Sequence, residues 1–139
     1  MSKKKRQKPY ETNMASEFFV LSTLHRIGLD PAITLGNKKA VDITLVKNGR
    51  QITIDVKGMA SKTSWLLGEK RPHRSPTHYY ILVTFLDDFK NLLIHPECYI
   101  IPSREISKLH GKQPGGKGYG ILYRNLVYTK YRENWKLIK

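Results

Sequence analysis

Apolar and polar residues alternate along residues 40–57, and this pattern predicts two β-strands. The strands span residues 40–47 and 50–57, and Asn48-Gly49 between them is a strong signal for a two-residue hairpin turn. With that turn, Lys47 faces Arg50. The apolar positions on one face then meet each other across the hairpin: Val41 with Val56, Ile43 with Ile54, and Leu45 with Ile52. A one-residue slip would expose this whole set, so the pattern specifies the register.

An apolar stripe at helical spacing precedes the hairpin and predicts a helix over residues 13–27. Thr12 or Asn13 can cap its start, and Gly28 stops it. The stripe consists of Met14, Phe18, Leu21 and Leu24. Residues 29–36 are expected to form a short first strand.

The rest of the chain mixes strand and loop signals. Residues 58–77 are expected to form a long loop, and the nearly continuous apolar run 78–86 predicts a strand buried on both faces. A strand pair is expected within 91–101, a helix over 103–110, and a flexible Gly-rich loop over 111–120. A short strand and a short helix near 132–138 complete an α/β fold with a mixed sheet. We expect one domain over residues 10–139 after a disordered basic tail, residues 1–9.

The hairpin register places two carboxylates opposite each other. Asp42 faces Asp55, and Lys57 lies two residues beyond Asp55 on the same face. Like charges directly across a strand pair destabilise it. A divalent cation removes this conflict, because Mg²⁺ binds one or two carboxylates together with phosphate oxygens. The alternative is a solvent-exposed polar face on which Lys57 bridges the two aspartates, an arrangement that contributes little.

Glu17 is a third candidate carboxylate. It lies on the apolar stripe of the predicted helix, with Leu21 and Leu24 at the next turns. Burying a carboxylate is costly unless it is paired or bound to a metal, so this position favours a site. The alternative is an acidic residue that stabilises the N-terminal turns of the helix.

A helix Glu17, a strand Asp42 and an Asp55-x-Lys57 motif across a hairpin resemble the PD-(D/E)xK nuclease superfamily. Its members include restriction endonucleases and Holliday-junction resolvases. The resemblance implies a restriction-endonuclease-like mixed sheet, with a central antiparallel hairpin flanked by helices. It also implies Mg²⁺-dependent hydrolysis of DNA phosphodiester bonds, on structured or branched DNA among other substrates, with Mn²⁺ as a substitute ion. By resemblance, Asp42, Asp55 and the Val56 main-chain oxygen bind the metal, and Glu17 supports it directly or through water. Lys57 orients or activates the attacking water.

Two features depart from the usual pattern of that superfamily. Val41, rather than proline, precedes Asp42, and the second acid is Asp55 rather than glutamate. In addition, the helix that usually lies between the third and fourth strands is not evident in residues 58–77.

The charge distribution predicts a polyanionic partner. The chain has 139 residues, 25 Lys and Arg against 11 Asp and Glu, and a net charge of +14. Residues 1–9 hold five basic and no acidic residues, and residues 103–139 hold nine basic and two acidic ones. We therefore expect DNA binding, with RNA as the alternative. The candidate contact residues are Lys3, Lys4, Lys5, Arg6, Lys8, Arg74, Lys112, Lys117, Arg124, Lys130 and Arg132.

Several other classes are disfavoured by the sequence. There is no apolar run long enough to span a membrane and no apolar segment after the basic N-terminus, so a cytoplasmic protein is expected. Residues 111–117 match GxxxxGK, but Gly118 replaces the Ser or Thr of a nucleotide-binding loop. A homodimer is compatible with two-strand cleavage. The alternative to an enzyme is a catalytically silent nucleic-acid-binding module or subunit with a nuclease-like fold.

Overall fold

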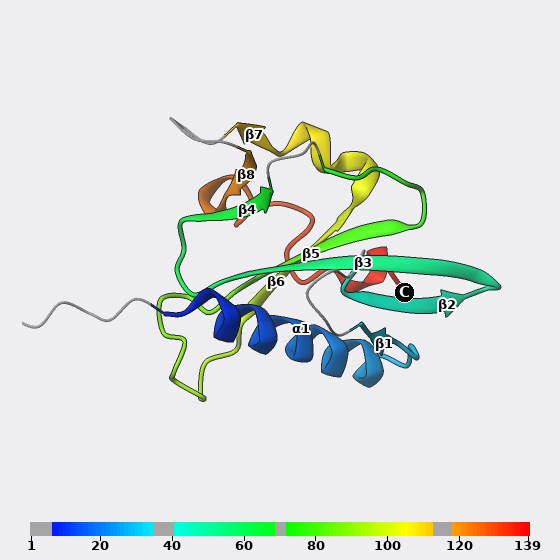
Figure 1. The fold of residues 1–139 in the computed structure, drawn as a ribbon, viewed down its shortest axis with the longest axis horizontal. Helices are drawn as coiled ribbons and strands as arrows, with labels where there is room; N and C mark the ends of the chain where they lie inside the picture. The colour runs from blue at the N-terminus through cyan, green and yellow to red at the C-terminus, as the bar shows by residue number, and fades with distance from the viewer. Residues whose placement is uncertain (1–6, 35–40, 69–71, 113–117) are drawn as a thin grey trace, which may run out of the picture.

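A five-stranded mixed sheet forms the centre of the computed structural model, which describes residues 7–34, 41–68, 72–112 and 118–139. The strand order is β1-β2-β3-β5-β6, with β3 and β5 parallel and the other neighbours antiparallel (Figure 1). The bounds are β1 (Ala32–Ile33), β2 (Ile43–Lys47), β3 (Arg50–Met59), β5 (His78–Thr84) and β6 (Glu97–Pro102). The α/β class and the mixed sheet are as the sequence predicts.

The β2–β3 hairpin has the predicted register. Ile43 pairs with Ile54, Leu45 with Ile52, and Lys47 with Arg50. The turn residues Asn48 and Gly49 have φ values of 52° and 74°, and asparagine and glycine accept such values most readily.

The register does not extend to the aspartates. β2 begins at Ile43, and the Asp42 N–H donates to the Ile54 carbonyl at 3.0 Å. The Asp42 carbonyl accepts from the Thr34 N–H at 2.8 Å, which draws the chain toward β1. The predicted Asp42–Asp55 strand pair is therefore not formed: the ladder ends at Ile43–Ile54, and the Asp42 N–H also bonds the Ile54 carbonyl. β3 continues past Ile54 to Met59, and no strand among the described residues pairs with its β2 side there. We call this side of Asp55–Met59 the open edge of β3.

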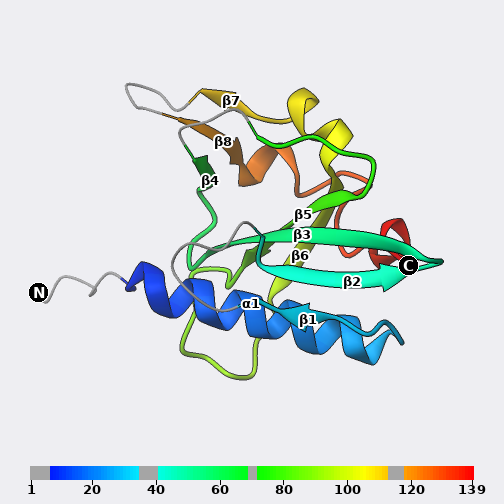
Figure 2. The same ribbon diagram turned by 45° about the vertical axis from the view of Figure 1, so that its right-hand side comes forward.

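Helix α1 (Pro9–Arg26) covers one face of the sheet, as Figures 1 and 2 both show. Val20 and Leu24 are fully buried in one core cluster with Ile54 and Val56. The helix starts earlier than predicted because Pro9, inside the expected tail, suits the first helical position. Residues 1–6 of that tail lie outside the described residues.

The opposite face is covered by a second sheet rather than by α-helices in the described part of the chain. This sheet has the order β4-β8-β7, with β4 (Ser64–Gly68), β7 (Gly111–Lys112) and β8 (Tyr119–Leu122). β4 lies in the segment predicted to be a loop. Its Trp65 and Leu67 are buried and its Leu66 is exposed, and the Trp65 Nε1–H donates to the Val83 carbonyl at 2.9 Å.

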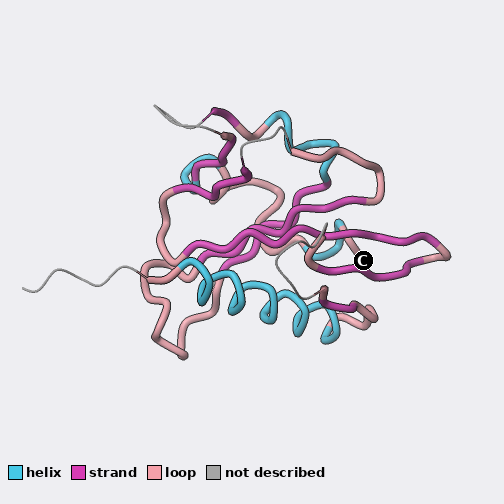
Figure 3. Tube along the Cα trace, in the orientation of Figure 1, coloured by secondary structure: helices cyan, strands magenta, loops and turns pink. Residues whose placement is uncertain are grey.

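The remaining elements are shorter than the sequence suggested. β5 is buried on both faces as predicted, but β6 is a single strand preceded by a long loop over residues 85–96 (Figure 3). The expected helix at 103–110 is the 3₁₀ helix η1 (Ser103–Lys108), and two further 3₁₀ turns are η2 (Tyr123–Asn125) and η3 (Trp135–Leu137). None of the described helices has the length and apolar character of a membrane span.

Candidate functional site

The two faces of β3 carry different residues, because alternate side chains of a strand point in opposite directions. Ile54 and Val56 join the core cluster under α1, whereas Met59 joins the cluster on the other face. Asp55 and Lys57 have the same alternation as Met59. Both therefore lie on the face turned away from α1, and both are half-buried.

Asp42 reaches this strand with its side chain. Its Oδ2 accepts a hydrogen bond from the Val56 N–H at 2.7 Å. The N–H and C=O of one strand residue point to the same side, so the Val56 carbonyl is also directed toward the open edge of β3. Asp42 and the Val56 main-chain oxygen therefore meet at that edge.

His78 holds the Asp55 carboxylate. The His78 Nε2 lies 3.2 Å from Asp55 Oδ2, and its Nδ1 lies 2.7 Å from Thr53 Oγ1. A carboxylate only accepts hydrogen bonds, so Nε2 carries the proton, and in the neutral ring Nδ1 accepts from the Thr53 hydroxyl. Asp55 is thus oriented by a partly buried chain of hydrogen bonds from Thr53 through His78.

Two neighbouring rings fix the His78 imidazole. The rings of His73 and Tyr80 each lie 5.0 Å from it, centroid to centroid, in edge-on geometry. The Tyr80 hydroxyl donates to the His73 carbonyl at 3.2 Å. Burial, with a smaller contribution from the Asp55 charge, raises the pKa of Tyr80 to about 12, so the phenol stays protonated at neutral pH.

Glu17 belongs to the opposite face. It is buried in α1, at 4% exposure, one residue after Ser16, which packs on Gly58 of β3. No group of three or more His, Cys, Asp or Glu side chains converges in the described residues in a way that could hold a metal. The structure therefore brings Asp42 to β3 beside Asp55 and Lys57, and places Glu17 on a helix that approaches the same strand from the other side.

Asp42 and the Val56 carbonyl at this edge, together with Asp55 on the adjacent face, are of the chemical type that suits a hard cation. Mg²⁺ prefers carboxylate and carbonyl oxygens, keeps several waters, and needs only one or two protein carboxylates. Asp42, Asp55 and the Val56 carbonyl are oxygen donors of this kind. Asp42 and Asp55 both lie partly open rather than sealed in the core.

Sequence reasoning missed the roles of Thr53, His78 and Tyr80. His78 opens an apolar run and is itself 2% exposed, and this position was the only available signal. The parallel pairing of β3 with β5 sets Thr53 beside His78 and Asp55 beside Tyr80. The topology of the segment between β3 and β5 could not be assigned from the sequence, so the pairing of these two strands could not be predicted.

The predicted nucleic-acid contacts divide into three groups. Lys3, Lys4, Lys5, Arg6 and Lys117 lie outside the described residues. Exposed positions are occupied by Lys8, Arg74, Lys112 and Arg124. Lys130 pairs with Glu105 at 3.0 Å and Arg132 with Glu97 at 3.4 Å, so carboxylates partly balance the last two charges.

Comparisons with known proteins give a likeness of fold. No family model and no curated protein sequence matches this chain. Among solved structures, the chain resembles the bacterial homing endonuclease I-Ssp6803I, with a TM-score of 0.58 and 13% sequence identity. The match covers 94% of this chain and 91% of that one. The two proteins thus share a fold over nearly their whole lengths.

Proposed function

We propose that this protein is a Mg²⁺-dependent nuclease that hydrolyses phosphodiester bonds in DNA. The observation that carries the proposal is the Asp42–Val56 hydrogen bond at the open edge of β3. It brings a second carboxylate to the strand that bears Asp55 and Lys57. This combination of groups matches the pattern of the PD-(D/E)xK superfamily.

The metal would be held by Asp42, Asp55 and the Val56 carbonyl. Glu17, which lies on the α1 side of β3, would support the metal through water. When bound, Mg²⁺ lowers the pKa of a water ligand and neutralises charge on the phosphoryl oxygens. Lys57, on the face of Asp55, donates toward the attacked phosphate and orients the attacking water. His78 keeps the Asp55 carboxylate in one orientation, as partners of metal ligands commonly do.

Two further observations support DNA as the substrate. The net charge of +14 favours a polyanion, and the fold resembles that of a homing endonuclease. Because one fold can host many activities, the site residues carry more weight than the likeness of fold does.

A plasmid-nicking assay tests the proposal. Wild-type protein should nick supercoiled plasmid in Mg²⁺ or Mn²⁺ and stop when EDTA is added. Asp55→Asn should abolish nicking, whereas Asp30→Asn, an exposed acid beside β1, should not. If folded wild-type protein cleaves neither plasmid, branched DNA nor RNA, the proposed nuclease activity is refuted.

The second candidate is a nucleic-acid-binding module without catalysis. It is favoured by the hydrogen bonds that already engage Asp42 and Asp55 with Val56 and His78. Thermal melting separates the two functions. A ligand that binds only the folded state raises the melting temperature, so Mg²⁺ should stabilise the wild-type enzyme but not Asp42→Ala. A pure binding module should show no metal effect in either protein.

A further inference from the structure

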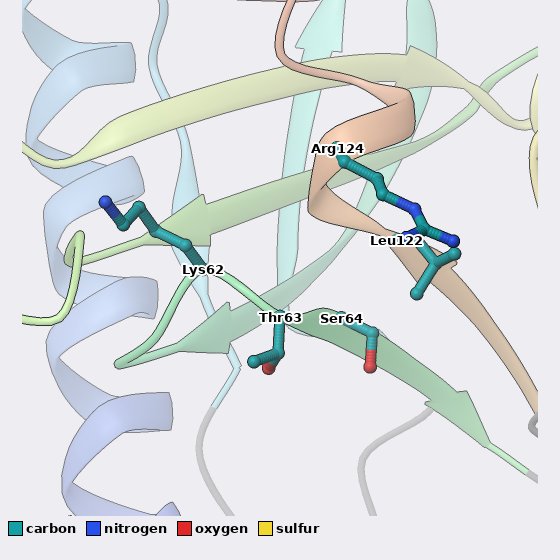
Figure 4. A pocket seen from close by; sticks show the side chains of 5 residues that line it. All are labelled: Lys62, Thr63, Ser64, Leu122 and Arg124. Atoms are coloured by element: carbon teal, nitrogen blue, oxygen red, sulfur yellow. The ribbon is translucent and has the colours of Figure 1, made fainter.

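A pocket lies at the junction of the two sheets, just beyond the end of β3. Its volume is about 310 Å³. Five described residues line it: Lys62, Thr63, Ser64, Leu122 and Arg124 (Figure 4). Two of the five are cations, two are hydroxyl residues, and none is acidic. Among them, only Arg124 is a nucleic-acid contact predicted from the sequence.

Backbone pairing fixes the two walls of this pocket against each other. Ser64 of β4 pairs with Leu122 of β8, and the Tyr123 N–H donates to the Thr63 carbonyl at 2.9 Å. The Thr63 hydroxyl also lies 2.9 Å from the Ser61 hydroxyl. The segment that carries Lys62 and the turn that carries Arg124 are therefore held side by side before any ligand arrives, which lowers the entropic cost of binding.

The arrangement of donors suits a chain of phosphates. In Figure 4 the Lys62 side chain extends toward α1 and the Arg124 side chain extends the opposite way, and the Thr63 and Ser64 side chains point in a third direction. A single small anion would need the cations to converge. Two separated cations beside two hydroxyl residues instead match a polymer backbone that carries repeated negative charges.

The pocket is tied to the strand that carries the candidate site. Lys62 follows the last residue of β3, Met59, by three positions. The intervening loop is anchored by the Thr84 hydroxyl, which donates to the Ser61 carbonyl, and by the Asp87 N–H, which donates to the Ala60 carbonyl at 2.8 Å. The position of this pocket is therefore fixed relative to Asp55 and Lys57.

We propose that Lys62, Thr63, Ser64 and Arg124 form a binding site for the sugar–phosphate backbone of DNA. This inference rests on the proposed function and deepens it, because the site would hold the substrate strand beside the end of β3. It is a positioning surface and takes no part in bond cleavage.

Salt-dependent DNA binding in EDTA, where cleavage is blocked, tests this site. The variants are Lys62→Ala, Arg124→Ala and the double variant. The matched control is Arg50→Ala with Lys136→Ala, two exposed cations on the hairpin and on η3. Each phosphate contact contributes about −0.9 to the slope of log affinity against log salt, so the slope of the Lys62/Arg124 double variant should be less negative by about 1.8. Its affinity for a short duplex should fall by about tenfold or more, and the control should change by much less.

The possible outcomes separate the site from the nuclease. If both double variants lose DNA affinity equally, with melting temperatures unchanged, the pocket is refuted as a DNA-binding site. That result would leave the proposed nuclease activity unaffected. Retention of affinity in Arg124→Lys supports a charge contact, and its complete loss there would contradict one. Inorganic phosphate that binds the pocket as tightly as the duplex does would overturn the backbone assignment. Absence of both DNA binding and nicking by wild-type protein would instead refute the proposed function.

Discussion

The two faces of β3 serve different purposes. Toward α1, Ile54 and Val56 are buried among apolar side chains, and Gly58 lets the helix approach closely. Toward the second sheet, Thr53, Asp55 and Lys57 are half-buried polar residues. Because successive side chains alternate, one strand can stabilise the fold with one face and present chemistry with the other.

The two faces also meet different energetic demands. Apolar burial needs only close packing, since the gain follows the area removed from water. A buried polar group needs a partner, because leaving one unsatisfied costs about 1–3 kcal/mol. His78 meets this demand with two hydrogen bonds, to Thr53 and to Asp55. Changes on the polar face should therefore affect function first, and changes on the apolar face should affect stability first.

Lys57→Ala should produce the largest effect, and it acts on the polar face alone. Loss of one donor aimed at transition-state charge typically lowers a rate by about 100- to 1000-fold. The rate of plasmid nicking should fall by this factor while the melting temperature stays close to that of wild type. Lys136→Ala, which removes an exposed cation from η3, serves as the control and should cleave normally. Full nicking by folded Lys57→Ala would contradict the division between the faces.

His78→Ala should affect both metal binding and stability. Loss of a partner that orients a metal ligand commonly weakens metal affinity by about 10- to 100-fold. It should also lower the free energy of unfolding by about 1–3 kcal/mol, because Thr53 and Asp55 lose their shared partner. Calorimetric titration with Mn²⁺ and denaturant unfolding measure the two effects. A large stability loss with unchanged metal affinity would make His78 purely structural.

Gly58→Ala should affect stability alone. An added Cβ would lie 2.0 Å from the Ser16 Oγ and 2.8 Å from the Ser16 Cβ, so α1 would have to shift. Overpacking of this kind costs about 1–3 kcal/mol, to be measured by denaturant unfolding. Gly111→Ala is the matched control, since a Cβ there meets nothing within 4 Å, and it should be nearly neutral. Equal effects in both variants would show that the α1 face tolerates extra volume.

The loss of stability at alkaline pH should depend weakly on Tyr80. The pKa of Tyr80 is about 12 in the folded chain and about 10 when unfolded, because burial disfavours the phenolate. Above pH 10 the unfolded state loses this proton first, so the contribution to stability is complete below pH 10 and is lost as pH rises toward 12. Tyr80→Phe should flatten the fall in melting temperature over that window. An unchanged profile would mean that other groups, such as Tyr131, dominate it.

Local signals were enough to predict the hairpin. The Asn48-Gly49 turn and the strict alternation around it lie within a short segment, and both specify one register. The offset of Asp42 was not predictable in this way. It arises from a hydrogen bond to Thr34, at the edge of a strand whose own signal is weak.

Non-local pairing explains most of what the sequence failed to predict. The sequence predicts a loop where β4 forms, because the partner of β4, β8, lies more than fifty positions further along the chain. The Thr53–His78–Asp55 chain likewise exists only because β3 and β5 are parallel neighbours. Asp42, Asp55 and Lys57 could be identified as candidates from the sequence. His78, which orients Asp55, could be identified only from the fold.

A crystal soaked with Mn²⁺ or Mg²⁺ would show whether a metal binds beside Asp42 and Asp55. We expect one ion at the open edge of β3, with oxygens of Asp42, Asp55 and the Val56 carbonyl about 2.1 Å away and Glu17 linked to it through water. An ion at that edge in wild type, and none in Asp55→Asn, would place the metal where the proposed chemistry needs it. Saturating Mn²⁺ that leaves this edge empty while Asp55 stays bonded to His78 would contradict the nuclease and favour a protein that only binds nucleic acid.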